Sequence, residues 1–317
     1  MMRVASIGEC MVELSDAGGG LLARSYGGDT LNTAVYLARL GVGVDYITAL
    51  GDDPLSEAML AAWQQEGVGT GLVVRLPGRL PGVYLIDADA RGHRRFYYWR
   101  DSAPARLLFE LPQAPKIAAA LLEYHLIYLS GVSLSLYGEL GRQRLFAALD
   151  AARARGRLIA FDTNFRPRGW SDLGTAQAAF RAAFGRADIV LASTEDLQLL
   201  FGPSGIGELP TGDAEREIVL KLAEPAVRVS HGGDQQLITA DPVGGVVDTT
   251  AAGDSFAAAY IAARLGGASP AAAARTGHRW PPPSCAIAAR SFRARPCRSG
   301  WIAPTSSRRR AHEQHGR

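Results

Sequence analysis

The chain has 317 residues, of which 47% are hydrophobic and 21% charged, as expected for a soluble globular protein of one large domain or two ordinary ones. No apolar run approaches the ~20 residues of a membrane span, and no secretory signal is visible. Residues 1–279 carry a net charge of −4 within a total of +3, so the body of the chain does not predict a nucleic-acid-binding surface. The three cysteines, Cys10, Cys285 and Cys297, lack disulfide or metal-ligand spacing, and we expect a reducing, cytoplasmic compartment.

The N-terminal segment predicts two strands and a helix. Residues 4–8 form a continuous apolar run, and residues 11–14 alternate apolar and polar side chains, as a strand with one exposed face does. The sequence YGGDTLN at 26–32 then leads into a helix closed by Gly41. Taken alone, a Gly-Gly pair before a helix is most often only a turn and a cap.

An aromatic segment, FYYWR at 96–100, follows the predicted strands 72–75 and 83–86. Strand alternation places Phe96, Tyr98 and Arg100 on one face. Aromatic residues interleaved with arginines can bind nucleic acid, although a solvated strand face is the more common explanation.

Polar residues follow two of the next predicted strands, which cover 126–129, 158–161 and 188–191. The sequence DTNFRP at 162–167 ends the second strand, and STED at 193–196 ends the third. In a chain that alternates strands and helices, ligands bind at the carboxyl ends of the strands. We expect a binding site there, although Ser193 is equally suited to cap a helix.

The stretch at 246–265, VVDTTAAGDSFAAAYIAARL, predicts a strand end, a turn of small residues and the start of a helix. Free N–H groups and the helix dipole make such a turn an anion site. A carboxylate would repel a bound phosphate, so Asp254 makes sense there as a base that takes a proton from an attacking hydroxyl. From this stretch alone, a helix N-cap explains Asp254 equally well.

Several of these segments together resemble the ribokinase-like (PfkB) carbohydrate kinases, in the form typical of 2-keto-3-deoxygluconate kinases. They are GECMVELS at 8–15, GGDTLNTA at 27–34, LPGVYLID at 80–87 with FYYWR, DTNFRP, and DTTAAGDSF at 248–256. The resemblance covers residues 1–279. It implies an α/β fold, a three-layer αβα domain with a mostly parallel sheet and a small β-sheet lid near 10–28 and 82–101. Relatives often dimerise through such lids, so we expect a homodimer or a higher homo-oligomer.

The resemblance also implies roles for individual residues. The catalytic group comprises the base Asp254 and the anion hole Ala251, Ala252 and Gly253. The expected substrate contacts are Gly28, Asp29, Asn32, Tyr84, Tyr98, Arg100 and Arg166. The expected contacts with ATP are Asn164, Ser193, Ser230, Gly232, Gly233, Thr249 and Gly253, with Asp196 as a ligand of Mg²⁺.

The nucleotide side departs from the family pattern at three places. Relatives have Asn-x-x-Glu where this chain has Ser193 and Asp196. A hairpin is predicted from 227–230 and 236–239, and in this interpretation Ser230 stands where relatives have the lysine of Val-Lys-x-Gly. The gap at 240–245 is then too short for a further hairpin, which predicts a missing strand edge beside the nucleotide.

The predicted activity is ATP-dependent phosphorylation of the 6-hydroxyl of 2-keto-3-deoxygluconate. The guanidinium groups of Arg100 and Arg166 match a substrate carboxylate, which a neutral sugar lacks. One alternative is another PfkB sugar kinase of the fructokinase or ribokinase type. Another is a non-catalytic remnant that still binds a sugar acid.

Residues 280–317 form a different kind of segment. They contain three consecutive prolines at 281–283 and eight arginines, with no periodicity, and such a composition is typical of disorder. A coding sequence for LAAAVMRNRGAIIPRAAMPVGM, read one nucleotide later, can give WPPPSCAIAARSFRARPCRSGW. We therefore interpret this tail as the product of a frameshift, because RGAIIP is the ending expected from the resemblance.

Overall fold

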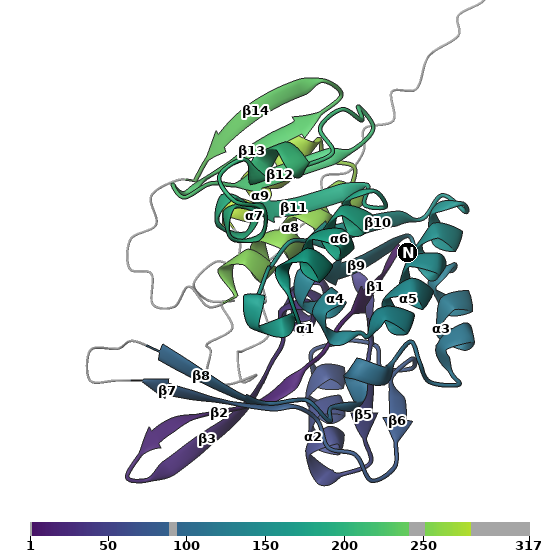
Figure 1. Cartoon of the computed structure of the whole chain (residues 1–317), viewed down its shortest axis with the longest axis vertical. Helices are drawn as coiled ribbons and strands as arrows, with labels where there is room; N and C mark the ends of the chain where they lie inside the picture. The colour runs from purple at the N-terminus through teal and green to yellow at the C-terminus, as the bar shows by residue number, and fades with distance from the viewer. Residues whose placement is uncertain (1, 89–93, 241–250, 280–317) are drawn as a thin grey trace, which may run out of the picture.

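The computed structural model describes residues 2–88, 94–240 and 251–279, and its centre is a sheet of eight strands (Figure 1). The strands stand in the order β14-β13-β12-β11-β10-β9-β1-β4. Six of them pair in parallel, and β13 and β14 run antiparallel at one edge. Their bounds are β1 Arg3–Ile7, β4 Gly43–Ile47, β9 Leu126–Ser130, β10 Leu158–Asp162, β11 Ile189–Ser193, β12 Glu217–Lys221, β13 Ala226–His231 and β14 Asp234–Thr239.

Helices cover both faces of this sheet. The cores on the two faces are separate, and buried side chains from α1, α2, α8 and α9 belong to one of them, whereas those from α3 to α7 belong to the other. Strands covered on both faces are mostly apolar, which explains the near-continuous apolar runs in the sequence. The helices are α1 Asp29–Arg39, α2 Pro54–Gln65, α3 Ala114–Leu121, α4 Gly131–Leu136, α5 Glu139–Arg153, α6 Leu173–Phe184, α7 Thr194–Phe201, α8 Ala252–Leu265 and α9 Pro270–Arg279. This three-layer arrangement confirms the expected fold class.

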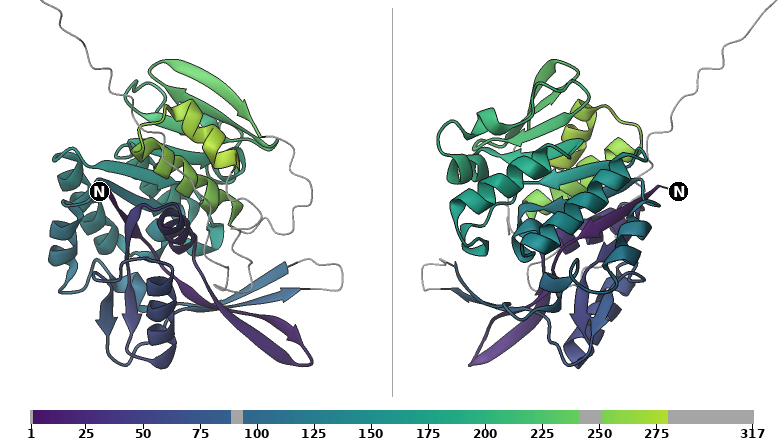
Figure 2. Two further views of the ribbon diagram at one scale, coloured as in Figure 1. Left: turned by 180° about the vertical axis from the view of Figure 1, so that it is seen from behind. Right: turned by 45° about the vertical axis from the view of Figure 1, so that its right-hand side comes forward.

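A second sheet of four strands projects from the three-layer body (Figure 2). Its order is β3-β2-β7-β8, with bounds β2 Met11–Gly18, β3 Leu21–Gly27, β7 Val83–Ala88 and β8 Arg94–Trp99. A short parallel pair, β5 Ala49–Gly51 and β6 Val74–Leu76, lies apart from it. The second sheet exposes large apolar side chains, among them Leu21 and Trp99. In the described part of the chain, no helix has the length and apolarity required to cross a bilayer.

Strand β12 corrects one prediction. The hairpin expected at 227–230 and 236–239 is present as β13 and β14, but an additional strand, β12, separates it from β11. The missing strand edge was expected at the 240–245 gap, of which only Ala240 belongs to the described residues, so it stays a prediction. Strand β12 is weakly marked in the sequence, because its apolar run is only Ile218 to Leu220, with Glu217 and Lys221 at its ends.

The junction between β9 and α4 has no room for a side chain at Gly131. An added Cβ would lie 2.1 Å from the carbonyl oxygen of Thr163 and 2.4 Å from a ring carbon of Phe180. We predict that Gly131→Ala lowers the free energy of unfolding by about 1–3 kcal/mol, as overpacking does. Gly71→Ala is the matched control, because no atom lies within 4 Å of a Cβ built there. Equal melting temperatures of the two variants would contradict this packing argument.

Candidate active site

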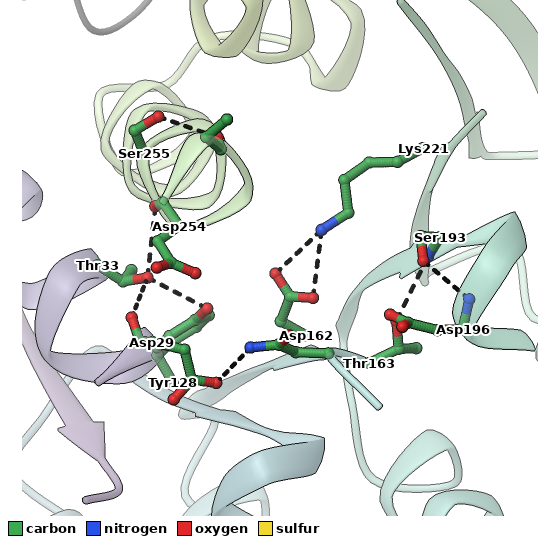
Figure 3. Close-up of polar contacts among 12 residues, drawn as sticks. Asp29, Thr33, Tyr128, Asp162, Thr163, Ser193, Asp196, Lys221, Asp254 and Ser255 are labelled. Atoms are coloured by element: carbon green, nitrogen blue, oxygen red, sulfur yellow. Dashed lines mark hydrogen bonds and ion pairs between the residues drawn. The ribbon is translucent and has the colours of Figure 1, made fainter. Parts of the chain in front are cut away.

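The polar residues gather where the carboxyl ends of the parallel strands meet the first turns of α1 and α8 (Figure 3). Asp162 ends β10, Ser193 ends β11 and Lys221 ends β12. Asp29 begins α1, and Asp254 lies in the first turn of α8. The sheet thus brings together residues from five segments that are distant in sequence, as parallel α/β sheets do at this edge.

Asp254 is not the N-cap of its helix. The cap is Ala251, which has a left-handed φ of 67° and no side chain that could accept from the first turn. Asp254 is the third residue of α8, and its Oδ2 accepts a hydrogen bond of 2.9 Å from Nδ2 of Asn32. The first-turn N–H groups are therefore left without a side-chain cap, as an anion site requires.

The surroundings of Asp254 make its carboxylate unusually basic. Burial and the negative charge of Asp29 raise its pKa to about 8, and Asp162 adds to this effect. The hydrogen bond from Asn32 and the charge of Lys221 act in the opposite direction. A base with a pKa near the working pH is efficient in proton transfer, so the geometry and the electrostatics of Asp254 agree with a catalytic role.

The segment GGDTLNTA at 27–34 supplies two polar contacts through α1. Nδ2 of Asn164 donates to Oδ2 of Asp29 at 2.7 Å, from a backbone with a positive φ of 27°. Gly28 stands before α1, where an added Cβ would lie 2.2 Å from the carbonyl oxygen of Glu9. Asn32, which the resemblance places on the sugar, also donates to Asp254. Gly28, Asp29 and Asn32 are thus brought to Asp254.

Lys221 is a functional candidate that the sequence analysis missed. Its Nζ lies 3.3 Å from both carboxylate oxygens of Asp162 and 3.6 Å from the position of a Cβ added to Gly253. Burial raises the pKa of Asp162, and Lys221 lowers it. The short apolar run that ends in Lys221 indicates a strand with a lysine at its carboxyl end. The sequence analysis does not include this lysine because it does not predict β12.

The opposite end of the strands, next to the amino end of β12, holds Ser230, Gly232 and Gly233. Ser230 pairs with Ile218 near the start of β12, since β13 runs antiparallel to β12, and the two glycines follow it. The structure therefore does not bring them to Asp254, and their assignment to the nucleotide is not retained. Thr249 lies outside the described residues.

Asp196 is held by protein groups at the end of β11. Its Oδ2 accepts from Oγ1 of Thr163 at 2.7 Å, its N–H donates to Ser193, and Oδ1 lies 3.8 Å from Arg166. Ser193 thus caps α7. Among the described residues, no three His, Cys, Asp or Glu side chains gather as a metal site. Asp196 is a single carboxylate at this position, and its role as a ligand of Mg²⁺ stays a prediction.

The expected acid-binding residues lie on and near the projecting sheet. Tyr84 is buried, its hydroxyl donates to Glu13, and its ring centroid lies 5.9 Å from that of the exposed Tyr98. Arg100 forms an ion pair with the buried Glu9. The side chain of Arg166 is 61% exposed. Each arginine has an acidic neighbour, Glu9 for Arg100 and Asp196 for Arg166, and Arg166 is the more exposed of the two.

The comparisons with known proteins point to one family. The model of the pfkB family carbohydrate kinases matches residues 1–280. A 2-dehydro-3-deoxygluconokinase from Dickeya dadantii is 44% identical over 286 residues, 87% of this chain and 92% of the relative. A fructokinase from Klebsiella pneumoniae is 30% identical over 82% of this chain and 83% of its own length. The crystal structure of 2-dehydro-3-deoxygluconokinase from Thermotoga maritima matches the fold with a TM-score of 0.76, at 23% identity, over 92% of this chain and 97% of that chain.

The raised pKa of Asp254 predicts a dependence of stability on pH. The folded protein binds a proton at Asp254 up to a pH of about 8, whereas the unfolded chain releases it near 4. Asp254 therefore reduces the free energy of unfolding as the pH rises from about 4 to 8, by at most about 1.4 kcal/mol per pH unit. Asp254→Asn should raise the melting temperature at pH 8 and have little effect at pH 4. A difference between variant and parent that does not change with pH, measured against Asp150→Asn at a surface ion pair, would contradict this.

Proposed function

Because this chain belongs to the pfkB family of carbohydrate kinases, we propose that it transfers the terminal phosphoryl group of ATP to the 6-hydroxyl of 2-keto-3-deoxygluconate, also called 2-dehydro-3-deoxygluconate. The product is 2-keto-3-deoxy-6-phosphogluconate. The observation that carries the proposal is the Asp254 carboxylate, fixed by Asn32 beside an uncapped helix start. The similarity to the relative from Dickeya dadantii supports the choice of substrate.

Asp254 acts as the general base in this proposal. Asn32 bonds Oδ2, so we assign Oδ1 to the substrate hydroxyl. As Oδ1 takes the proton, the hydroxyl oxygen bonds to the γ-phosphorus and the bond to the departing ADP oxygen breaks. The first-turn N–H groups of Ala252 and Gly253 and the dipole of α8 stabilise the charge of the phosphoryl group in transfer.

The nucleotide lies, in this proposal, along the carboxyl ends of β10 to β12. Asn164 and Ser193 stand at those ends, and Gly253 allows the phosphates to approach the backbone. Lys221 adds a positive charge beside Gly253. Mg²⁺ arrives with ATP as part of the substrate.

The sugar acid lies between Asp254 and the projecting sheet. Gly28, Asp29 and Asn32 are assigned to its hydroxyl end, and Tyr84, Tyr98, Arg100 and Arg166 to its acid end. A guanidinium can bind a carboxylate through two parallel hydrogen bonds, which suits an acid rather than a neutral sugar. The exposed apolar side chains of the projecting sheet are the surface to which we assign a homodimer contact. The place of action is the cytoplasm.

Two alternatives are distinguished by specific observations. A fructokinase-type activity is favoured by the similarity to fructokinases, but the lower identity of the Klebsiella relative speaks against it. A non-catalytic remnant that still binds a sugar acid is favoured by the altered tail and the short 240–245 gap, and ATP-dependent turnover of 2-keto-3-deoxygluconate by the parent protein would exclude it.

Asp254→Asn tests the catalytic assignment. We predict a fall in turnover of about 10²–10⁴-fold, because the amide cannot take the proton. Binding of 2-keto-3-deoxygluconate, measured by calorimetry, should stay within a few-fold of the parent. Near-normal phosphorylation by this variant would refute the role of Asp254, and Asp150→Asn controls for the loss of one carboxylate.

Arg100→Lys and Arg166→Lys test the substrate class. Each should reduce kcat/KM for 2-keto-3-deoxygluconate by about tenfold or more, since a hydrogen bond to a charged group contributes about 1.5–3 kcal/mol. The kcat/KM for fructose should change little. Arg181→Lys, at a surface pair with Glu208, is the control. Equal losses on the acid and on the neutral ketose would show that the two arginines do not select the carboxylate.

A further inference from the structure

Glu9 connects the two ends of the site that we assign to the sugar acid. It lies two residues after β1, and its side chain is 2% exposed. Its carbonyl oxygen lies 2.2 Å from the position of a Cβ built on Gly28, the glycine before α1. Its carboxylate forms an ion pair with Arg100, which directly follows β8. Glu9 therefore contacts one residue from the hydroxyl end and one from the acid end.

The pair of Glu9 and Arg100 is packed closely against Gly82. A Cβ built on Gly82 would lie 2.9 Å from Oε1 of Glu9 and 3.1 Å from Cβ of Arg100. Gly82 directly precedes β7, and its carbonyl oxygen accepts a hydrogen bond of 2.8 Å from the N–H of Val12 on β2. The base of the projecting sheet thus holds both side chains, and only a glycine at this position leaves room for them.

Arg100 retains a donor that the protein does not use. Nη2 meets Oε2 of Glu9, but Nε is buried and has no hydrogen-bond partner among the residues that the structure describes. A buried donor without an acceptor is costly, and an oxygen of a bound ligand would remove that cost. Because a guanidinium holds its N–H groups in one fixed plane, a partner at one nitrogen determines where the others point.

Glu9 also offsets the charge of Arg100. A carboxylate that approaches this arginine therefore meets an ion pair rather than an isolated cation. Its binding then depends on directed hydrogen bonds from the remaining N–H groups, which are strong only when the two planes are aligned. The orientation of the guanidinium is thus the property that decides whether an acid is bound here.

We propose that Glu9 is a positioning residue that orients Arg100 toward the carboxylate of the sugar acid. Glu9 holds one nitrogen of the guanidinium, and the substrate carboxylate accepts from the donors that remain, Nε among them. Because Glu9 also contacts the glycine before α1, it sets the spacing between the acid end and the hydroxyl end of the site. This inference deepens the proposed function and rests on Arg100 as a contact of the substrate acid.

The test compares 2-keto-3-deoxygluconate with its uncharged methyl ester in the variant Glu9→Gln, which keeps the size of the side chain but not its charge. The dissociation constant of the acid, measured by calorimetry, should rise about tenfold or more, the effect of a weakened hydrogen bond to a charged group. The dissociation constant of the ester and kcat for the acid should change little. Glu66→Gln is the matched control, because it removes the same charge from another shielded pair, with Arg39.

A double-mutant cycle shows whether Glu9 acts through Arg100. In the background Arg100→Gln, the change Glu9→Gln should have no further effect on the affinity for the acid. A merely structural role of Glu9 would instead lower that affinity by the same factor in both backgrounds, and this result would overturn the inference.

Gly82→Ala is a second variant in case Glu9→Gln does not fold. The added methyl group displaces the carboxylate of Glu9 without changing any charge, so acid binding should weaken in the same direction, and ester binding should not. An unchanged affinity for the acid in the folded Glu9 and Gly82 variants contradicts the positioning role. If instead Arg100→Gln weakens the acid and the ester equally, the proposed recognition of an acid itself fails, and the two failures are thereby distinguished.

Discussion

The hydrogen bond from Asn32 to Asp254 is the interaction on which the site depends. It joins residues 222 positions apart, and with them the first turns of α1 and α8. The hydroxyl of Thr33 makes a second contact between the same two helices, at the carbonyl oxygen of Asp254. Because α1 and α8 pack on the same face of the sheet, their first turns converge at the carboxyl ends of the strands. The segments GGDTLNTA at 27–34 and DTTAAGDSF at 248–256 thus contribute to one site only when the whole parallel sheet is formed.

The site concentrates features that disfavour folding. The charges of Asp29 and Asp162 raise the pKa of Asp254, and the charge of Lys221 lowers it. Asn164 and Ala251 both have a positive φ, which costs about 1–3 kcal/mol for residues other than glycine. Such strain and like-charge repulsion persist where the surrounding structure fixes them, and the two apolar cores on either face of the sheet provide that support. The anion-binding turn and the basic carboxylate are the functional result.

The fold was predictable from sequence because strands buried on both faces read as continuous apolar runs, and the signatures identify the site. The sequence failed where a strand was weakly marked. Strand β12 has three apolar residues between charged ones, so its lysine went unnoticed and Ser230 was assigned in its place. The sequence also does not indicate which side chains contact one another. Periodicity places Asn32 on a helix face, but it does not show that the amide meets Asp254 or that Glu9 pairs with Arg100.

The central claim is that the fold makes Asp254 a strong base, and a direct titration of this carboxyl group tests it. Protein labelled with ¹³C at the aspartate carboxyl carbons can be followed by NMR across pH, with the Asp254 signal identified by its absence from Asp254→Asn. Because burial and the charge of Asp29 raise the pKa of Asp254, we expect a midpoint of about 8 for this signal. A midpoint near 4, the value of an unperturbed aspartate, would contradict it.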